Sequence, residues 1–305
     1  MMKSKKLTVA IAVIVILAMA QTGFYAYMTA VRDNGNKKVK DAPAATEQVF
    51  GDTAASDQII KAVKQPKKAV DISKVKLSAD IENTISKLDS KNGKKYVQKY
   101  KTMLAELKVP DKFKGEIEKS LKKGYNTPEV LIAYQYLYEN YGQVSDLEKL
   151  LAKKKSGKQW SAIFREYTAA SKPFVPSNFK QGYIESLIEK YHFTPDDIMI
   201  ADRISQKGIK TFDELVEMKK QGKTWEQINT ELGILNTEEK LPRLALTSGQ
   251  VKKLMQDTKL SEQQVVNALV MAEKLDKDDT EVLDMVKAGE KDDDIYAAGF
   301  DEKYR

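Results

Sequence analysis

The feature that most constrains the fold of this 305-residue chain is an internal repeat of 67 residues. Gly115, Gly182 and Gly249 are each 67 positions apart, and a β-branched aliphatic residue follows each glycine by two positions. Six positions beyond the glycines lie Leu121, Ile188 and Met255. A fixed period of this length is typical of repeat proteins, in which each unit buries its apolar face on a neighbouring unit. The sequence therefore predicts tandem copies of one structural unit.

Each unit carries signals for the starts and ends of helices at matching positions. A helix-start pattern recurs as TPEV at 127, TPDD at 194 and SEQQ at 261. In this pattern the Thr or Ser caps the helix, and Pro has the correct φ for the first turn. A second capped helix in each unit stops at Gly157, Gly222 or Gly289, because glycine readily takes the left-handed cap. No segment from 74 to 305 alternates apolar and polar residues over any length, so we expect no sheet there.

These signals predict an all-α fold with three tandem repeats of about 67 residues, each of several helices, stacked end to end as an array. Aliphatic-Pro pairs lie between the units, where proline ends the preceding helix. The predicted segments are a signal anchor or signal peptide (1–31), a flexible basic spacer (32–73), a helical cap (74–109) and helical repeats 1, 2 and 3 (110–175, 176–241 and 242–305).

The N-terminus has the composition of a membrane-targeting segment. Lys3, Lys5 and Lys6 precede an uncharged, mostly apolar stretch over residues 7–31. These 25 positions are long enough to span a hydrocarbon core of about 30 Å, and the lysines favour a cytoplasmic N-terminus. The sequence predicts a single-pass membrane protein with its C-terminal part outside the cell. The alternative is cleavage after Ala20, which ends a small-x-small pattern, and secretion of the remainder.

Charge is distributed unevenly along the chain, whose formal net charge is +7. Residues 31–130 contain 22 Lys and Arg against 14 Asp and Glu, whereas residues 131–305 contain 26 against 30. A basic half close to the membrane suits anionic headgroups or an anionic wall polymer as partners. The alternative is a solvated lysine-rich surface without a specific partner. We expect no nucleic acid partner for an exported chain.

The two tryptophans lie in two copies of one short motif. KSGKQWSAI (155–163) contains Trp160 and QGKTWEQIN (221–229) contains Trp225, each preceded by Gly-Lys-x and followed three residues later by Ile. The third copy reads GEKDDDI and has Asp292 in place of the tryptophan. The motif is the last element of the unit, a short helix entered through the glycine.

Two interpretations of this motif remain open from the sequence. In the first, each indole packs the last helix of a unit against the rest of that unit. In the second, Trp160 and Trp225 are exposed beside Lys158 and Lys223 and bind a peptide or a glycan, as aromatic side chains do at many interfaces. These four residues are the candidate partner-binding residues. With no cysteine and with His192 as the single histidine, we expect no catalytic residue, no cofactor and no metal.

The pattern DI…AD…F.EL..MKKQGKTWEQINTELGI (197–234) resembles tandem helical repeats of uncharacterised exported bacterial proteins. Those repeats carry a similar Gly-Lys-Ser-Trp and a terminal Leu-Gly. Leu232-Gly233 matches the pattern, while Tyr167-Thr168 and Gly299-Phe300 depart from it in the other units. The likeness covers about residues 115–305. It implies an all-helical exported scaffold and no activity.

The sequence therefore predicts a non-enzymatic scaffold of the bacterial envelope that binds an envelope protein or an anionic wall polymer along its helical surface. One alternative is an exported hydrolase of wall glycan or peptide, which requires paired carboxylates in a groove with one of them desolvated. A second alternative is a regulatory partner of a membrane sensor.

Overall fold

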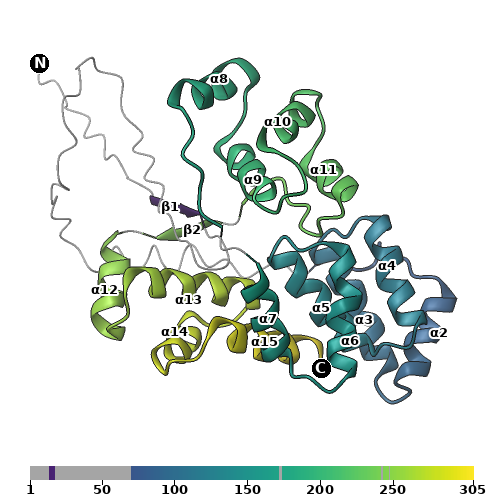
Figure 1. The fold of residues 1–305 in the computed structure, drawn as a ribbon. Coiled ribbons are helices and arrows are strands. Elements are labelled where there is room, and N and C mark those ends of the chain that lie inside the picture. The colour runs from purple at the N-terminus through teal and green to yellow at the C-terminus, as the bar shows by residue number, and fades with distance from the viewer. Residues whose placement is uncertain (1–13, 18–69, 172–173, 242, 247) are drawn as a thin grey trace, which may run out of the picture.

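The computed structural model describes residues 14–17, 70–171, 174–241, 243–246 and 248–305. These residues form fourteen α-helices and one short 3₁₀ helix, so the predicted all-α class is correct (Figure 1). Apart from its last four residues, the predicted spacer lies outside the described part of the chain.

The helices follow one another in four sets, which we name the cap and the first, middle and last groups. The cap consists of α2 (Ala79–Leu88) and α3 (Gly93–Glu106). The first group consists of α4 (Asp111–Lys122), α5 (Thr127–Glu139), η1 (Val144–Asp146, the 3₁₀ helix), α6 (Leu147–Lys155) and α7 (Trp160–Ala170). The middle group consists of α8 (Gln181–Tyr191), α9 (Pro195–Ser205), α10 (Phe212–Lys220) and α11 (Trp225–Leu232). The last group consists of α12 (Ser248–Thr258), α13 (Glu262–Leu275), α14 (Asp279–Lys287) and α15 (Asp292–Tyr304).

Two short strands pair in an antiparallel ribbon, β1 (Ile14–Leu17) and β2 (Arg243–Leu246). The expectation of no strand over residues 74–305 is therefore wrong at β2. A strand of four residues has only two positions on each face, and two positions are too few to show an alternating apolar and polar pattern in the sequence. Leu244 and Leu246 occupy the two positions on one face and pack partly buried against the largest apolar core.

The predicted membrane segment is described only at β1, and its other residues lie outside the described part of the chain. Among the described residues, no helix combines the length and the apolar character that crossing a membrane requires. The anchor over residues 7–31 stays a prediction.

Capping residues start several helices as the sequence predicts. Thr194 and Ser261 each accept a hydrogen bond from the backbone N–H three residues on, and the side chain of that residue accepts one from the cap in return. The prediction is wrong at Thr127, which is the first residue of α5 and is buried; the cap position is Asn126, which makes no side-chain cap bond. The predicted glycine stops are confirmed, with positive φ angles at Gly157, Gly222 and Gly289.

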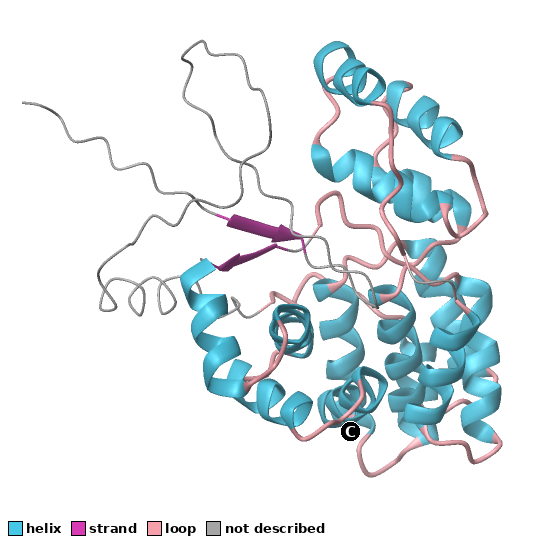
Figure 2. Ribbon diagram, turned by 60° about the vertical axis from the view of Figure 1, so that its left-hand side comes forward, coloured by secondary structure: helices cyan, strands magenta, loops and turns pink. Residues whose placement is uncertain are grey.

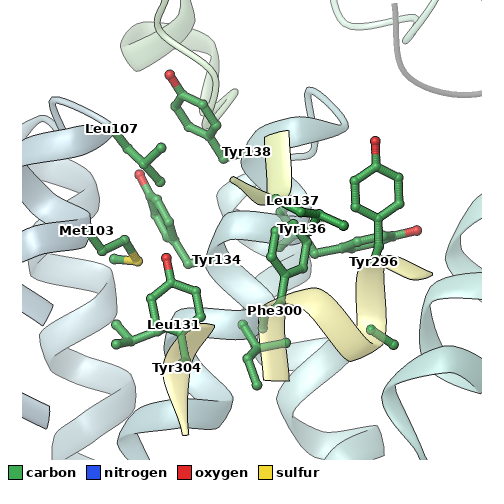
Figure 3. Close-up of a cluster of buried hydrophobic side chains, with 14 of the residues drawn as sticks. Met103, Leu107, Leu131, Tyr134, Tyr136, Leu137, Tyr138, Tyr296, Phe300 and Tyr304 are labelled. Atoms are coloured by element: carbon green, nitrogen blue, oxygen red, sulfur yellow. The ribbon is translucent and has the colours of Figure 1, made fainter. Parts of the chain in front are cut away.

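Helix α5 is the centre of the largest core. Every residue from Val130 to Tyr138 is buried, and α3, α4, α6 and α15 all pack against this helix. A helix that is apolar on all sides has to be surrounded by other elements. Figure 3 shows the result, with Leu131, Tyr134 and Tyr136 of α5 among side chains from the cap and from α15.

The order of packing differs from an end-to-end stack. Helix α15 of the last group packs on α5 and α7 of the first group, and one apolar core extends over the cap and these two groups. Phe300 meets Phe164 edge-on at 6.4 Å between ring centroids, and Tyr296 and Tyr304 are also buried (Figure 3). The physical reason is that α15 is buried on several sides, so a single neighbour cannot cover it.

The middle group has two smaller apolar clusters of its own and projects from the rest of the molecule (Figures 1 and 2). Backbone bonds tie its last loop to the loop after α5: Val144 N–H donates to Gly233 O at 2.8 Å, and Leu235 N–H donates to Gly142 O at 3.0 Å. The Arg203 guanidinium lies 4.7 Å from the centroid of the Tyr141 ring at the same junction. The middle group is therefore joined to the first group by loops and side chains, with its helices largely packed among themselves.

Two glycines in helices allow a matched test of this packing. A Cβ added at Gly299 would lie 2.7 Å from a Leu275 methyl, whereas one added at Gly115 would meet no atom within 4 Å. We expect Gly299→Ala to lower the free energy of unfolding by about 1–3 kcal/mol through overpacking. Gly115→Ala is expected to raise it by about 0.5–1 kcal/mol through helix propensity. Urea denaturation measures both, and stabilisation by Gly299→Ala would contradict the close approach of α15 to α13.

Candidate interaction surface

The two tryptophans make the same set of contacts in the first and middle groups. Trp160 begins α7, and its Nε1–H donates to Glu129 Oε2 at 2.6 Å. Trp225 begins α11, and its Nε1–H donates to Asp197 Oδ1 at 2.8 Å. Each indole therefore binds a carboxylate near the start of the second helix of its own group.

Lysines also occupy matching places around both rings. Lys154 Nζ lies 5.7 Å from the ring centroid of Trp160, and Lys219 Nζ lies 5.1 Å from that of Trp225. Both lysines are six residues before their tryptophan, so the helix that precedes the glycine turn supplies the cation. Packing, a charge-assisted hydrogen bond and a cation–π contact thus fix the last helix of the first group and of the middle group.

The structure places the predicted partner-binding residues as follows. Trp160 is 4% exposed and Trp225 is 0% exposed, so neither indole presents a face to a partner. Lys158 pairs with Glu166 and Lys223 pairs with Glu231, each at 2.6 Å between Nζ and a carboxylate oxygen. Of the two interpretations, the geometry supports packing, and the exposed aromatic grip is not what these side chains form.

The third copy of the motif has a different role because its helix is in the core. Asp292 begins α15, and the positions that hold Lys and Glu in the other copies hold Glu290 and Ala298. Burial raises the pKa of both Asp292 and Asp293. The Asp293 carboxylate accepts hydrogen bonds from the Thr168 hydroxyl at 3.1 Å and the Tyr136 hydroxyl at 3.4 Å. These hydrogen bonds join α15 to α7 and α5. The buried carboxyl of Asp293 therefore has a structural role in the core.

An open groove lies between the start of α4 and helix α11, lined by two acids, Glu226 and Glu231. The hydrolase alternative requires one desolvated carboxyl with a raised pKa. The hydrogen bond from Lys223 instead holds the pKa of Glu231 below its ordinary value. Within the described residues, no group of three His, Asp or Glu side chains is placed to hold a metal ion. His192 is exposed and ends α8 in the left-handed conformation.

Asp197 gives the middle group a dependence on pH. Burial acts to raise its pKa, but hydrogen bonds from the Thr194 hydroxyl and backbone N–H and from Lys219 outweigh burial and hold the pKa below its ordinary value. A carboxyl with a lowered pKa in the folded state stabilises the fold above its unfolded pKa, and this contribution is lost as pH falls through the folded pKa.

We therefore expect Asp197→Asn to lower the free energy of unfolding by about 1–3 kcal/mol at pH 7, because it weakens charge-assisted hydrogen bonds. The difference from the unchanged protein should start to shrink below about pH 4, where the unfolded carboxyl takes up a proton, and should be smallest below the lowered folded pKa, where Asp197 is neutral in both states. Denaturation at a series of pH values from 7 to 2 measures this. A difference that stays constant over that range would contradict the role of the Asp197 charge.

One apolar helix face in the middle group is uncovered, although its counterpart in the first group is buried. Leu121 of α4 is 1% exposed, whereas Ile188, at the same repeat position in α8, is 41% exposed. Met255, the third member, is partly buried against the main core. Helix α2 of the cap packs on α4 and covers it, while Figure 1 shows α8 at the outer end of the middle group with no described helix beyond it.

We name the surface of Ile184, Ile188 and Tyr191 the α8 face. Leu187 is buried beneath it and, with Phe193, holds the helix to α9 and α10. Ile184 packs partly buried against the same cluster, so the exposed members of the face are Ile188, at 41%, and Tyr191, at 39%. The three side chains follow one another at spacings of four and three residues, so they lie along one side of α8.

Charged groups border the α8 face. Lys220 Nζ lies 4.3 Å and Lys190 Nζ lies 5.2 Å from the centroid of the Tyr191 ring. Glu185 and Glu189, four residues apart and both exposed, follow the opposite border of Ile188. An apolar strip with basic groups at one edge and acidic groups at the other is suited to a partner with a complementary charge pattern.

Sequence reasoning did not single out the α8 face. The register of Leu121, Ile188 and Met255 presents all three as equivalent core positions. The difference between them lies outside the repeat, because α2 of the cap packs on α4.

Comparison of the chain with known protein families, with curated proteins and with solved structures finds no match. The resemblance to exported helical repeats stays a prediction.

Proposed function

We propose that this chain is a non-enzymatic, exported scaffold of the bacterial envelope that binds a protein partner through its middle group of helices. The observation that supports the proposal is the exposed α8 face, since Ile188 is 41% exposed where the equivalent Leu121 is covered by a cap helix. Ile188 is a large aliphatic side chain at a repeat position that is buried in the first group. Its exposure to water costs free energy unless a partner covers it.

The proposed location and architecture come from the sequence. The uncharged stretch over residues 7–31 would hold the chain in the membrane, and residues 32–73 would connect it to the helices. We also propose that the first, middle and last groups are copies of one unit of four helices. The repeated contacts of Trp160 and Trp225 support that relationship.

A photo-crosslinking amino acid at position 188 of the full chain, expressed in a bacterium with its envelope intact, tests the proposal. We expect one crosslinked protein in amounts comparable to the chain itself. The same probe at Gln256, an exposed position of α12 one repeat after Glu189, is the matched control. Equal crosslinking from both positions, or retention of the chain on purified wall polymer without a crosslinked protein, would contradict a protein partner at α8.

A further inference from the structure

The first group shows what the α8 face is shaped to bind, because its equivalent face is occupied. Helix α2 lies on α4, and the buried residues of α2 are Ile81 and Ile85, four positions apart. On the α4 side, Ile117 and Leu121 are buried in the same core. The occupant of this face is thus a short amphipathic helix that contributes two aliphatic side chains from consecutive turns.

Charge distinguishes the partner of α8 from α2 itself. Asp80 of α2 pairs with Lys122 of α4 at 2.8 Å. The residue 67 positions after Lys122 is Glu189, on the border of the α8 face. An acid at the place of Asp80 would meet the Glu189 carboxylate, and like charges at that distance repel. Helix α2 of a second copy of this chain is therefore a poor occupant, and a helix with a basic residue there is a good one.

The edge of the α8 face next to Tyr191 also restricts which partner helix can bind. Lys190 and Lys220 both lie over the Tyr191 ring, and Lys220 also pairs with Glu217 at 2.8 Å, so Lys190 supplies most of the positive charge at this edge. A partner helix with an acidic residue along that edge would pair with Lys190.

From these observations we infer that the α8 face binds an amphipathic helix of another protein, with two aliphatic residues four positions apart and a Lys or Arg directly before the first of them. The inference rests on the proposed function and specifies the chemistry of its partner. The partner helix lies on α8 as α2 lies on α4, with the exposed Ile188 and the outer side of the partly buried Ile184 receiving its aliphatic side chains and Glu189 pairing with its cation.

Two peptides test this chemistry with the full-length protein. Both reproduce residues 77–89 of this chain with a fluorescent label; one keeps Asp80 and the other carries Asp80→Lys. We expect the Asp80→Lys peptide to bind about threefold or more tightly than the Asp80 peptide in fluorescence anisotropy. Ile188→Asp should weaken its binding at least tenfold, and Glu189→Lys should reverse the order of the two peptides. Gln256→Asp on α12 is the matched control and should leave binding unchanged.

Other outcomes overturn the inference in distinguishable ways. Binding of both peptides that Ile188→Asp does not change, or no binding of either, excludes the α8 face as a site for such a helix. If crosslinking from position 188 still captures a stoichiometric protein, the proposed function survives and only the helix chemistry fails. If sedimentation shows a dimer that Ile188→Asp converts to a monomer, a second copy is the occupant. Circular dichroism of Ile188→Asp, a change at an exposed site, verifies that the variant is folded.

Discussion

Replacement of Trp225 by alanine is expected to lower the free energy of unfolding of the middle group by about 3–5 kcal/mol. The side chain is fully buried and belongs to the apolar cluster that α9, α10 and α11 share. The substitution removes the largest buried side chain of that cluster and leaves a cavity that a helix entered through a glycine turn cannot close. It also removes the N–H that donates to Asp197. A cavity and a lost hydrogen bond to a half-buried carboxylate are both among the costly changes in proteins.

The loss is expected to be local. The two apolar clusters of the middle group are distinct from the core that joins the cap, the first group and the last group, although Tyr141 of the first group belongs to one of them and Leu235 belongs to the main core. Hydrogen exchange should therefore speed up over residues 174–241 in Trp225→Ala and change little in α5. Trp160→Ala, which removes a side chain of the large core, should instead affect α5, α7 and α15.

Trp225→Phe separates the two contributions. Phenylalanine keeps most of the apolar volume but has no N–H, so we expect a smaller loss of about 1–2 kcal/mol. Chemical denaturation followed by circular dichroism measures both variants. A loss below about 1 kcal/mol for Trp225→Ala would show that the tryptophan is not a packing residue, and the exposed interpretation would regain support.

Much of the local structure could be predicted from the sequence because local signals determine it. The caps at Thr194 and Ser261 and the glycine stops depend on hydrogen bonds and φ angles within a few residues, and these are readable from the chain. The all-α class follows from the same signals. The strand β2 was missed because four residues carry too little periodicity to be recognised.

The packing of the groups could not be predicted, because it depends on contacts between residues far apart in the chain. The run of apolar residues in α15 indicates that this helix is buried, but it does not indicate that α5 and α7 are its neighbours. The exposure of Ile188 has the same origin: its repeat position predicts burial, but α4, which carries the buried Leu121, packs against α2, a contact between residues far apart in the chain. The candidate surface thus exists because two copies of the unit differ in their neighbours, and the sequence pattern of a repeat does not indicate such a difference.

A buried ion pair gives the strongest test of how the last group is attached to the first. Lys274 Nζ, near the end of α13, lies 3.1 Å from Glu139 Oε2, at the end of α5, and their side chains are 9% and 13% exposed. Burial lowers the pKa of Lys274, although the Glu139 charge opposes that shift. We expect Lys274→Met to lower the free energy of unfolding by about 3 kcal/mol, because it removes the lysine that pairs with the partly buried Glu139 carboxylate and leaves Arg203 as the neighbouring positive charge.

The double variant distinguishes a charge effect from a loss of packing. Glu139→Gln alone should cost about as much as Lys274→Met, since it leaves the lysine as the uncompensated charge. The two changes together remove both charges and should cost about 1 kcal/mol, so a double-mutant cycle should give a coupling energy of at least 2 kcal/mol. In Glu139→Gln the loss should also diminish at alkaline pH. When a lysine has a lower pKa in the folded state than in the unfolded state, the protein becomes more stable as pH rises through the folded pKa. The reason is that the buried lysine becomes neutral there. Additive single effects that are independent of pH would show that the two side chains contribute only volume to the junction of α5 and α13.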